Sequence, residues 1–205
     1  MFRDRTDAGE QLADTLEGRG VDPDIVLTIP RGGLPVGRAV ADRFGVPLDV
    51  VVAKKVGAPN NPELALGAVA EDGSVWRNEG LLEQVGMSDA EFDRERQRVR
   101  ESAREKAERY RHGPFSSLEG KRVAVVDDGL ATGATMRACL ARVRADGPAR
   151  IVVGVPVGPA DRIEELGGSA DVVVCVETPP AFRAVGAYYE RFDQVSDEEA
   201  IEYLE

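Results

Sequence analysis

Two adjacent acids followed by small residues form the stretch of this sequence that is best suited to chemistry. Asp127 and Asp128 end an apolar run, and among residues 129–135 only Leu130 is bulky. Ionised carboxylates accept hydrogen bonds and donate none, so a pair of them suits neighbouring sugar hydroxyls or a hard cation such as Mg²⁺. The small residues behind the acids leave the backbone open to a ligand.

The residues after the acids are typical of a turn that binds phosphate. A helix is expected to begin directly behind them, and the N–H groups at a helix N-terminus attract anions, phosphate above all. Thr132 and Thr135 add hydroxyl donors. We therefore expect a ribose 5-phosphate here, with its sugar at the acids and its phosphate in the turn. The alternative is that the acids and Gly129 make an ordinary turn and that Thr132 and Gly133 only cap a helix.

Five short apolar runs are expected to form the sheet that positions these residues. They are rich in Val and Ile and hardly alternate with polar residues, as strands buried on both faces do. The runs are 24–29, 48–53, 122–127, 150–157 and 170–177. Helical spacing follows at 33–45, 133–147 and 159–168. Strands that alternate with helices predict an α/β fold, in which a mostly parallel sheet has helices on both faces and binds ligands at its carboxyl edge.

Two segments depart from this alternation. Residues 66–78 contain two strand-like arms around the Asp-Gly pair at 72–73, which predicts a hairpin. Residues 88–111 predict a long charged helix with a capping box at Ser88 and Glu91. Its thin apolar stripe would pack on its own domain or on a partner, and consists of Phe92, Val99, Ala103, Ala107 and Tyr110.

The composition limits the classes of protein to which the chain can belong. With 205 residues, of which 42% are hydrophobic and 31% charged, it fits one globular domain. No apolar run approaches the length of a membrane span, and the first residues lack the apolar core of a secretory signal. A net charge of −11 and a pI of about 4.7 argue against nonspecific nucleic-acid binding.

Cysteine and histidine contribute no recognisable site. Cys139 and Cys175 lie far apart in apolar surroundings, so we expect buried free thiols and a reducing, cytoplasmic location. His112 is the single histidine and has no neighbouring ligand residues, which argues against a zinc site. The glycine patterns of a Walker A loop and of a dinucleotide site are also absent from the sequence.

The stretch VAVVDDGLATGATM resembles the signature with which type I phosphoribosyltransferases bind phosphoribosyl diphosphate (PRPP). It has the apolar strand, the two acids, the small turn, and Thr-Gly followed by a further Thr, without a gap. The resemblance covers about residues 5–195. It implies a Rossmann-like fold as a single domain over 1–205, with a flexible hairpin and helical hood at about 57–115. Within the family, the chain is similar to a group of predicted phosphoribosyltransferases that share the stretches IPRGG, KK.GAP and QVSDEE.

The resemblance implies roles for individual residues in binding PRPP. Asp127 and Asp128 bind the ribose hydroxyls and contact Mg²⁺ indirectly. Arg31, with the backbone of Gly32 and Gly33, binds pyrophosphate, and a strained or cis peptide is expected in this loop; a simple strand-to-helix turn is the alternative. The turn that holds the 5′-phosphate consists of Gly129, Leu130, Ala131, Thr132, Gly133, Ala134 and Thr135.

The remaining substrate contacts are expected from the end of the second apolar run and from the C-terminal segment. Lys54 and Lys55 are two of only four lysines, and we expect them to reach the diphosphate rather than to be random surface charge. The hood would shield the reactive sugar from water. In the segment 178–200, three aromatic residues either stack on a base or pack in the core. They are Phe182, Tyr188 and Tyr189.

The implied reaction transfers the 5-phosphoribosyl group of PRPP to a nitrogen acceptor, which we expect to be a nucleobase, and releases pyrophosphate. This is the chemistry of a pentosyltransferase in nucleotide metabolism. It would depend on positioning and charge stabilisation by Mg²⁺ and the catalytic residues. Those residues are Asp127, Asp128, Arg31, Lys54 and Lys55. A general base, if used, would be Glu63 or Glu71.

Other functions remain open for the same site. The chain could be a PRPP-binding regulatory protein without transferase activity, or it could carry an inactive site with a role in assembly. The acceptor could be a small amine, or water. Relatives in the family are often dimers, so a homodimer is possible.

Overall fold

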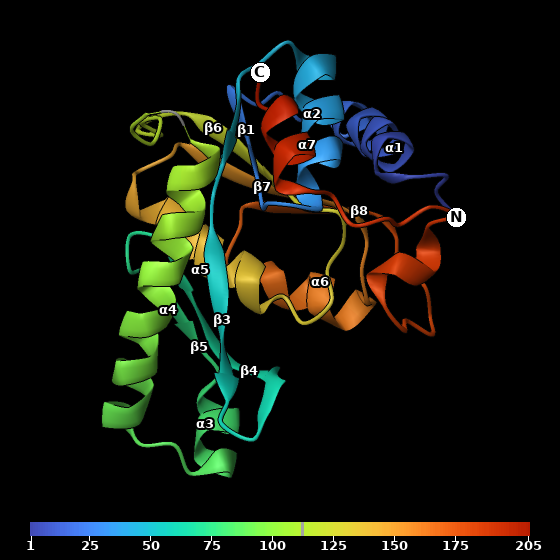
Figure 1. Cartoon of the computed structure of the whole chain (residues 1–205). Helices are drawn as coiled ribbons and strands as arrows, with labels where there is room; N and C mark the ends of the chain where they lie inside the picture. Colours follow the sequence, from blue (N-terminus) through green and yellow to red (C-terminus); the bar gives the residue numbers. More distant parts are fainter. Residues whose placement is uncertain (112) are drawn as a thin grey trace.

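The computed structural model of the chain has a parallel sheet with helices on both faces and a separate hood sheet below it (Figure 1). It describes residues 1–111 and 113–205, apart from the side chain of Glu63. The expectations for Glu63 as a base and for His112 therefore lie outside what is described. Among the described residues, no helix has both the length and the apolar character that crossing a bilayer demands.

The central sheet is parallel throughout and has the strand order β2-β1-β6-β7-β8. Its strands are β1 (Ile25–Thr28), β2 (Leu48–Val50), β6 (Arg122–Val126), β7 (Arg150–Val157) and β8 (Val172–Glu177). Each of the five predicted runs forms one of these strands, which confirms the α/β prediction. The run 48–53 is shorter than predicted, because β2 ends at Val50 and Ala53 already begins a strand of the second sheet.

Helices cover both faces of the sheet (Figure 1). One face carries α1 (Arg5–Gly18) and α2 (Gly33–Phe44), and the other carries α5 (Ala134–Ala145) and α6 (Ala160–Leu166). Successive residues of β1 show this division, since Val26 packs with α1 and α2 while Leu27 packs with α5. The sequence analysis did not predict α1, whose buried positions are mostly small or widely spaced among charged residues.

A second, antiparallel sheet and two helices form the hood, which we define as residues 53–110. Its elements are β3 (Ala53–Ala58), β4 (Asn61–Ala70), β5 (Val75–Arg77), α3 (Glu79–Val85) and α4 (Asp89–Tyr110). The predicted hairpin is present, and Gly73 supplies the positive φ of 100° at its turn. The hood begins earlier than the predicted 57, since β3 belongs to it from its first residue.

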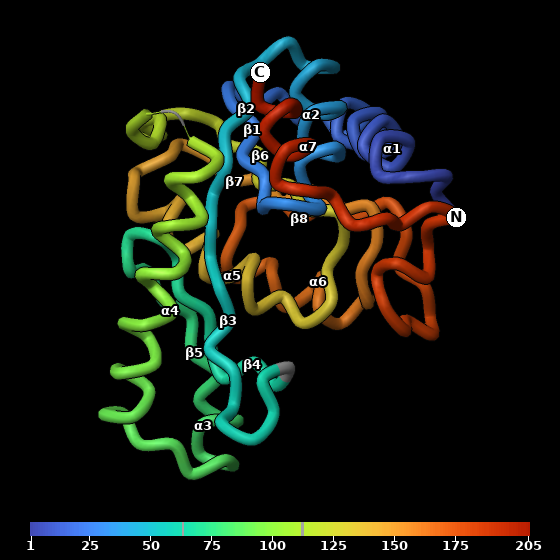
Figure 2. The backbone as a smooth tube through the Cα atoms, in the orientation of Figure 1, coloured from blue at the N-terminus to red at the C-terminus, as the bar shows by residue number. Residues whose placement is uncertain are grey.

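Helix α4 packs on its own chain along its whole apolar stripe. The capping box at Ser88 and Glu91 is formed as predicted. All five predicted stripe residues are buried. Phe92 and Val99 pack on β3 and β4. The three that follow them on the helix pack on Leu34, Val50 and the helix α7 (Asp197–Glu202). Figure 2 follows β3 and α4 as they run side by side.

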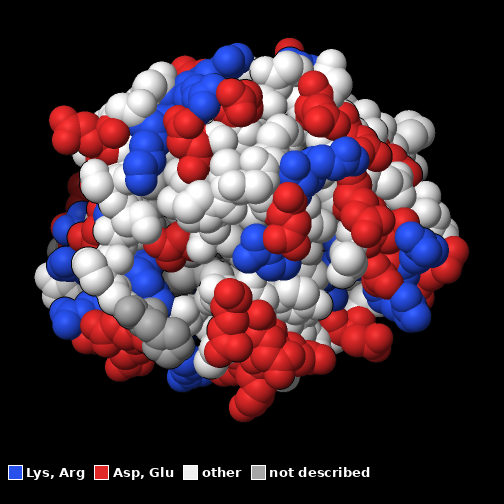
Figure 3. Space-filling view, turned by 90° about the horizontal axis from the view of Figure 1, so that it is seen from above, with Lys and Arg blue, Asp and Glu red and all other residues white. Residues whose placement is uncertain are grey.

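The acidic composition is visible on the surface. On the face drawn in Figure 3, basic side chains lie among more numerous acidic ones rather than in one continuous basic area. The two cysteines are free thiols, as predicted; Cys139 is buried and Cys175 is partly buried.

Candidate functional site

The register of the central sheet brings the predicted ligand loops to one edge. Thr28 of β1 pairs with Val126 of β6 on one side and with Val50 of β2 on the other. The loops that follow these three strands therefore leave the sheet next to one another. The acid pair follows β6, the loop 29–33 follows β1, and the lysines of β3 follow β2. This is the carboxyl edge at which open α/β sheets bind ligands.

The two acids are held close together and are only partly exposed, where they line a cavity. The backbone N–H of Asp128 donates to Oδ1 of Asp127 at 2.9 Å, and Nε of Arg5 donates to Oδ2 of Asp128 at 2.8 Å. Burial raises the pKa of Asp127 well above its usual range, and the charge of Asp128 adds to the effect. Burial also raises the pKa of Asp128, and the neighbouring Arg5 opposes that shift. A ligand that donates hydrogen bonds would therefore stabilise this pair.

The loop after β1 packs directly against the acids. A Cβ on Gly32 would lie 2.1 Å from Oδ2 of Asp128, and one on Gly33 would lie 2.6 Å from Oγ1 of Thr28. Glycine is therefore required at both positions. The peptide bond between Pro30 and Arg31 is cis, within the range in which the family resemblance placed one.

The turn after the acids leads into α5 through Gly133, whose φ is 75°. The amides of Ala131, Thr132 and Gly133 make no hydrogen bond within the described part of the chain, as a phosphate cradle requires. The buried Leu130 differs from the others, because its amide donates to the carbonyl of Val157 at 2.8 Å. Leu130 therefore anchors the turn rather than offering a donor to a ligand.

One cavity of about 620 Å³ contains all the residues predicted to be catalytic, together with Gly32 and Thr135. It is lined by Arg5, Ile29, Pro30, Arg31, Gly32, Ala53, Lys54, Lys55, Lys106, Asp127, Asp128, Thr135, Phe192, Gln194 and Val195. Of the turn residues, Thr135 lines this cavity, whereas Thr132 and Ala134 line a neighbouring cavity on the side of the hood. Residues that were predicted from the sequence, and that follow β1, β2 and β6 along the chain, thus meet at one cavity.

Arg5, Lys106 and Phe192 also line this cavity, although the sequence did not point to them. Arg5 pairs with Asp128, and its guanidinium carbon lies 3.8 Å from the ring centre of Phe192. Lys106 reaches the cavity from α4. None of the three belongs to a local motif, and the one signal for Lys106 was the scarcity of lysine in the chain.

The predicted aromatic residues fit the alternative of core packing. Tyr189 is buried against Phe2, and its hydroxyl donates to the backbone carbonyl of Asp128. Phe182 and Tyr188 stack on one another with ring centres 5.6 Å apart. None of these three lines the cavity that contains the acids. Tyr189 therefore holds the backbone of Asp128 through its hydroxyl, and among these aromatic residues Phe192 is the one that lines the cavity.

Glu71 is wrongly placed for the predicted role of a general base. Its carboxylate accepts a hydrogen bond from Nη1 of Arg111 at 2.7 Å and one from the N–H of Val52 at 3.2 Å. It is buried among these partners and does not line the cavity. Burial raises the pKa of this carboxyl, while Arg111 opposes the shift. Glu71 thus joins the hood to the core.

The comparison with known proteins agrees with this geometry. The family described as "Phosphoribosyl transferase domain" matches residues 6–190. The chain belongs to this family. Two curated proteins of Mycobacterium tuberculosis, "Putative phosphoribosyl transferase MT0597" and "Putative phosphoribosyl transferase Rv0571c", are each 43% identical over 207 residues. These matches cover 100% of this chain and 46% of each relative, so the chain spans about half the length of those relatives.

A solved structure supports the fold as well. The crystal structure of the protein TT1426 from Thermus thermophilus has 45% sequence identity and a TM-score of 0.85 to this phosphoribosyltransferase-family chain. The match covers 100% of this chain and 97% of that one. The family resemblance and the Rossmann-like parallel sheet predicted from the sequence are both confirmed.

Proposed function

We propose that the chain is a phosphoribosyltransferase, which transfers the 5-phosphoribosyl group of PRPP to a nitrogen acceptor and releases diphosphate. The observation that carries this proposal is the cavity in which the largely enclosed acid pair and cationic side chains from the loop after β1 and from β3 come together. A sugar that bears anionic groups at both ends suits this arrangement of acceptors and cations.

Each part of the cavity has a role in the proposed reaction. The ribose hydroxyls donate to the carboxylates of Asp127 and Asp128, and the 5′-phosphate accepts from the free amides of the turn. The bond between C1 and the diphosphate oxygen breaks with its electron pair, and the acceptor nitrogen forms the new bond to C1 and then loses a proton. Arg31, Lys54 and Lys55 face the negative charge that grows on the diphosphate. The reaction needs no nucleophilic side chain.

Magnesium would accompany the donor rather than reside in the protein. The described residues contain no group of three or more His, Cys, Asp or Glu that could hold a metal. The oxygen ligands available near the cavity are the carboxylates of Asp127 and Asp128, which suit Mg²⁺ directly or through water. When bound, the ion would neutralise charge on the diphosphate.

The acceptor that we propose is a nucleobase, which would place the protein in nucleotide salvage or related metabolism. The ring of Phe192 lines the cavity and offers a surface for an aromatic base. The amide of Gln194, in the same lining, offers both a donor and an acceptor to the edge of a base.

The test combines binding with turnover. We expect Mg-PRPP to bind in titration calorimetry, and Asp128→Asn to weaken that binding by about tenfold or more, because charged hydrogen bonds to the ribose are lost. Asp161→Asn removes an exposed acid on α6 and is the matched control, with unchanged affinity. Equal affinity of the parent and Asp128→Asn would contradict the proposal.

A screen of diphosphate release across nucleobases and small amines then identifies the acceptor. Release that depends on both PRPP and a base supports the transferase. Tight PRPP binding without release for any acceptor would favour the alternative, a PRPP-binding regulatory protein.

A further inference from the structure

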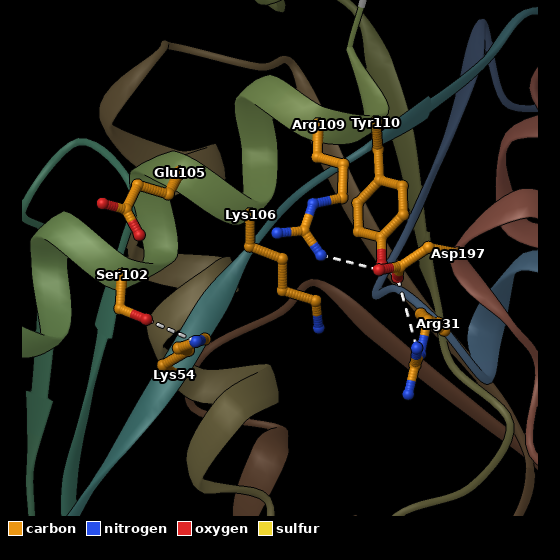
Figure 4. A pocket seen from close by; sticks show the side chains of 8 residues that line it. All are labelled: Arg31, Lys54, Ser102, Glu105, Lys106, Arg109, Tyr110 and Asp197. Atoms are coloured by element: carbon orange, nitrogen blue, oxygen red, sulfur yellow. Dashed lines mark hydrogen bonds and ion pairs between the residues drawn. The ribbon is translucent and has the colours of Figure 1, made fainter.

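A second, smaller cavity adjoins the one that contains the acids. It has a volume of about 290 Å³ and lies between the loop after β1, the inner face of α4 and the start of α7 (Figure 4). It shares Arg31, Lys54 and Lys106 with the larger cavity. Its lining consists of Arg31, Lys54, Ser102, Glu105, Lys106, Arg109, Tyr110 and Asp197.

Lys106 has donor capacity that the protein does not use. Its Nζ donates to the carbonyl of Pro30 at 2.7 Å, which is its one hydrogen bond among the described residues. An ammonium group carries three N–H donors, so two remain. In Figure 4 the Lys106 ammonium points into the space between Lys54 and Arg31. Burying a cation next to two others is unfavourable unless an anion joins them.

The charges of Asp127 and Asp197 favour the charged form of Lys106, but among the described residues no carboxylate forms a hydrogen bond or an ion pair with it. Asp197 accepts from Nη1 of Arg31 at 3.2 Å and from Nη1 of Arg109 at 2.6 Å, and also from the hydroxyl of Tyr110. Its two oxygens are thus engaged away from Lys106. Glu105 lines the cavity, but its carboxylate points away from Lys106 (Figure 4). Nζ of Lys54 is bonded to the hydroxyl of Ser102 and not to an acid.

We propose that this smaller cavity receives the diphosphate group of the donor and that Lys106, on α4, is a further binding residue for it. The inference rests on the proposed function and extends it to a hood residue that lies outside the PRPP signature. A diphosphate carries several negative charges on a compact group, and a lysine ammonium binds such oxygens as a point charge. As the C1–O bond breaks, the electron pair stays on the diphosphate, and Lys106 stabilises the charge that results.

The experiment measures binding of inorganic diphosphate to the full chain by titration calorimetry. We expect Lys106→Met and Lys106→Gln to weaken this binding by about tenfold or more, since each removes a charged hydrogen-bond donor. Lys106→Arg keeps the charge and should retain most of the affinity. Arg104→Met is the control on the same helix, because Arg104 pairs with Glu108 on the exposed side, and its affinity should equal that of the parent.

Ribose 5-phosphate, as a second probe, separates this inference from the proposed function. It occupies the acids and the turn but lacks the diphosphate, so Lys106→Met and Lys106→Gln should bind it as the parent does. If the parent binds neither PRPP nor ribose 5-phosphate, the proposed function fails. If the parent binds both while Lys106→Gln binds diphosphate with unchanged affinity, only the role of Lys106 is overturned. An equal loss of affinity for both probes would also overturn it, because that indicates a general structural defect.

Discussion

Asp127 and Asp128 place two carboxylates where water cannot easily solvate them. Their raised pKa values express this cost, which the fold bears in order to present acceptors to a ligand. Arg5 offsets part of the cost at Asp128, and nothing comparable among the described residues bonds to the Asp127 side chain except the neighbouring amide. The ionised carboxyl of Asp127 should therefore lower the free energy of unfolding of the ligand-free protein.

The first prediction concerns the pH dependence of that cost. Folding raises the pKa of Asp127 above its usual 3.8, so the folded state holds its proton to higher pH than the unfolded state. Stability contributed by the protonated form is then lost as the pH rises through this window. Asp127→Asn, which cannot ionise, should melt at a higher temperature than the parent near neutral pH, with each unit of pKa shift worth about 1.4 kcal/mol.

The measurement is the melting temperature of ligand-free parent and variant from about pH 4, near the ordinary pKa of an aspartate, up to about pH 8. The difference between them should grow with pH. Asp161→Asn should follow the parent throughout. Two parallel curves for parent and Asp127→Asn would show that the carboxyl of Asp127 ionises without cost.

At this scale the sequence predicted the residues that lie within one local motif. The acids, Arg31 and Gly32 were found because each stands at a strand end with its neighbours in a characteristic order. Arg5 and Lys106 were missed because they reach the site across the fold, and Arg5 stands 123 residues from its partner Asp128. Their charges look like ordinary surface charges until the chain is folded.

Among the elements, α1 contributes to the site through its first residue. Arg5 begins α1, donates to Asp128, and also donates from Nη1 to the carbonyl of Asp193 at 2.6 Å. It thereby joins three segments that are far apart in sequence. Its side chain is 11% exposed and that of Asp128 is 16% exposed, so the pair is largely shielded from water.

We predict that Arg5→Ala lowers the free energy of unfolding by about 1–3 kcal/mol, because it leaves the buried carboxylate of Asp128 without a cationic partner. Arg3→Ala is the matched control, since Arg3 pairs with Asp7 near the start of the same helix but is 68% exposed. Its effect should be clearly smaller than that of Arg5→Ala, because solvent screens an exposed ion pair. Urea denaturation of both variants measures the difference. Equal effects would show that the Arg5–Asp128 pair stabilises the fold no more than the exposed Arg3–Asp7 pair does.

The elements were predictable to the extent that their pattern was local and regular. The Val- and Ile-rich strands were predicted correctly because burial on both faces leaves short continuous apolar runs, and the stripe of α4 because burial on one face leaves a helical period. The end of β2 was not predicted correctly, because residues 48–53 are almost continuously apolar while the chain passes from one sheet to the other. Helix α1 was missed because small residues make up much of its buried face.

In the whole molecule, the hood and the central sheet share their apolar core. Ala65, Ala68 and Ala70 of β4 belong to the same cluster as α5 and the central strands. The upper part of α4 packs on residues of α2, β2 and α7. The pair of Glu71 and Arg111 adds a buried ionic link. These contacts argue that the hood is part of one cooperative unit.

We therefore predict that hood and core unfold together. Trp76 lies on β5 and is the single tryptophan of the chain, so its fluorescence reports on the hood and on its contact with α5, where Arg137 lies over the ring. Far-ultraviolet circular dichroism reports on all helices and strands. The two signals should give the same melting midpoint, as cooperative unfolding of one unit requires. A fluorescence transition at clearly lower temperature would show instead that the hood opens independently.

The close approach of Gly32 to Asp128 has a practical consequence for engineering. Any larger residue at position 32 would displace the carboxylate that we propose binds the ribose, so we expect libraries that vary this loop to consist mostly of inactive members. Phe192 stacks on Arg5, the partner of Asp128, whereas Gln194 borders the cavity without a bond to either of them among the described residues. Directed evolution toward new acceptors should start at Gln194.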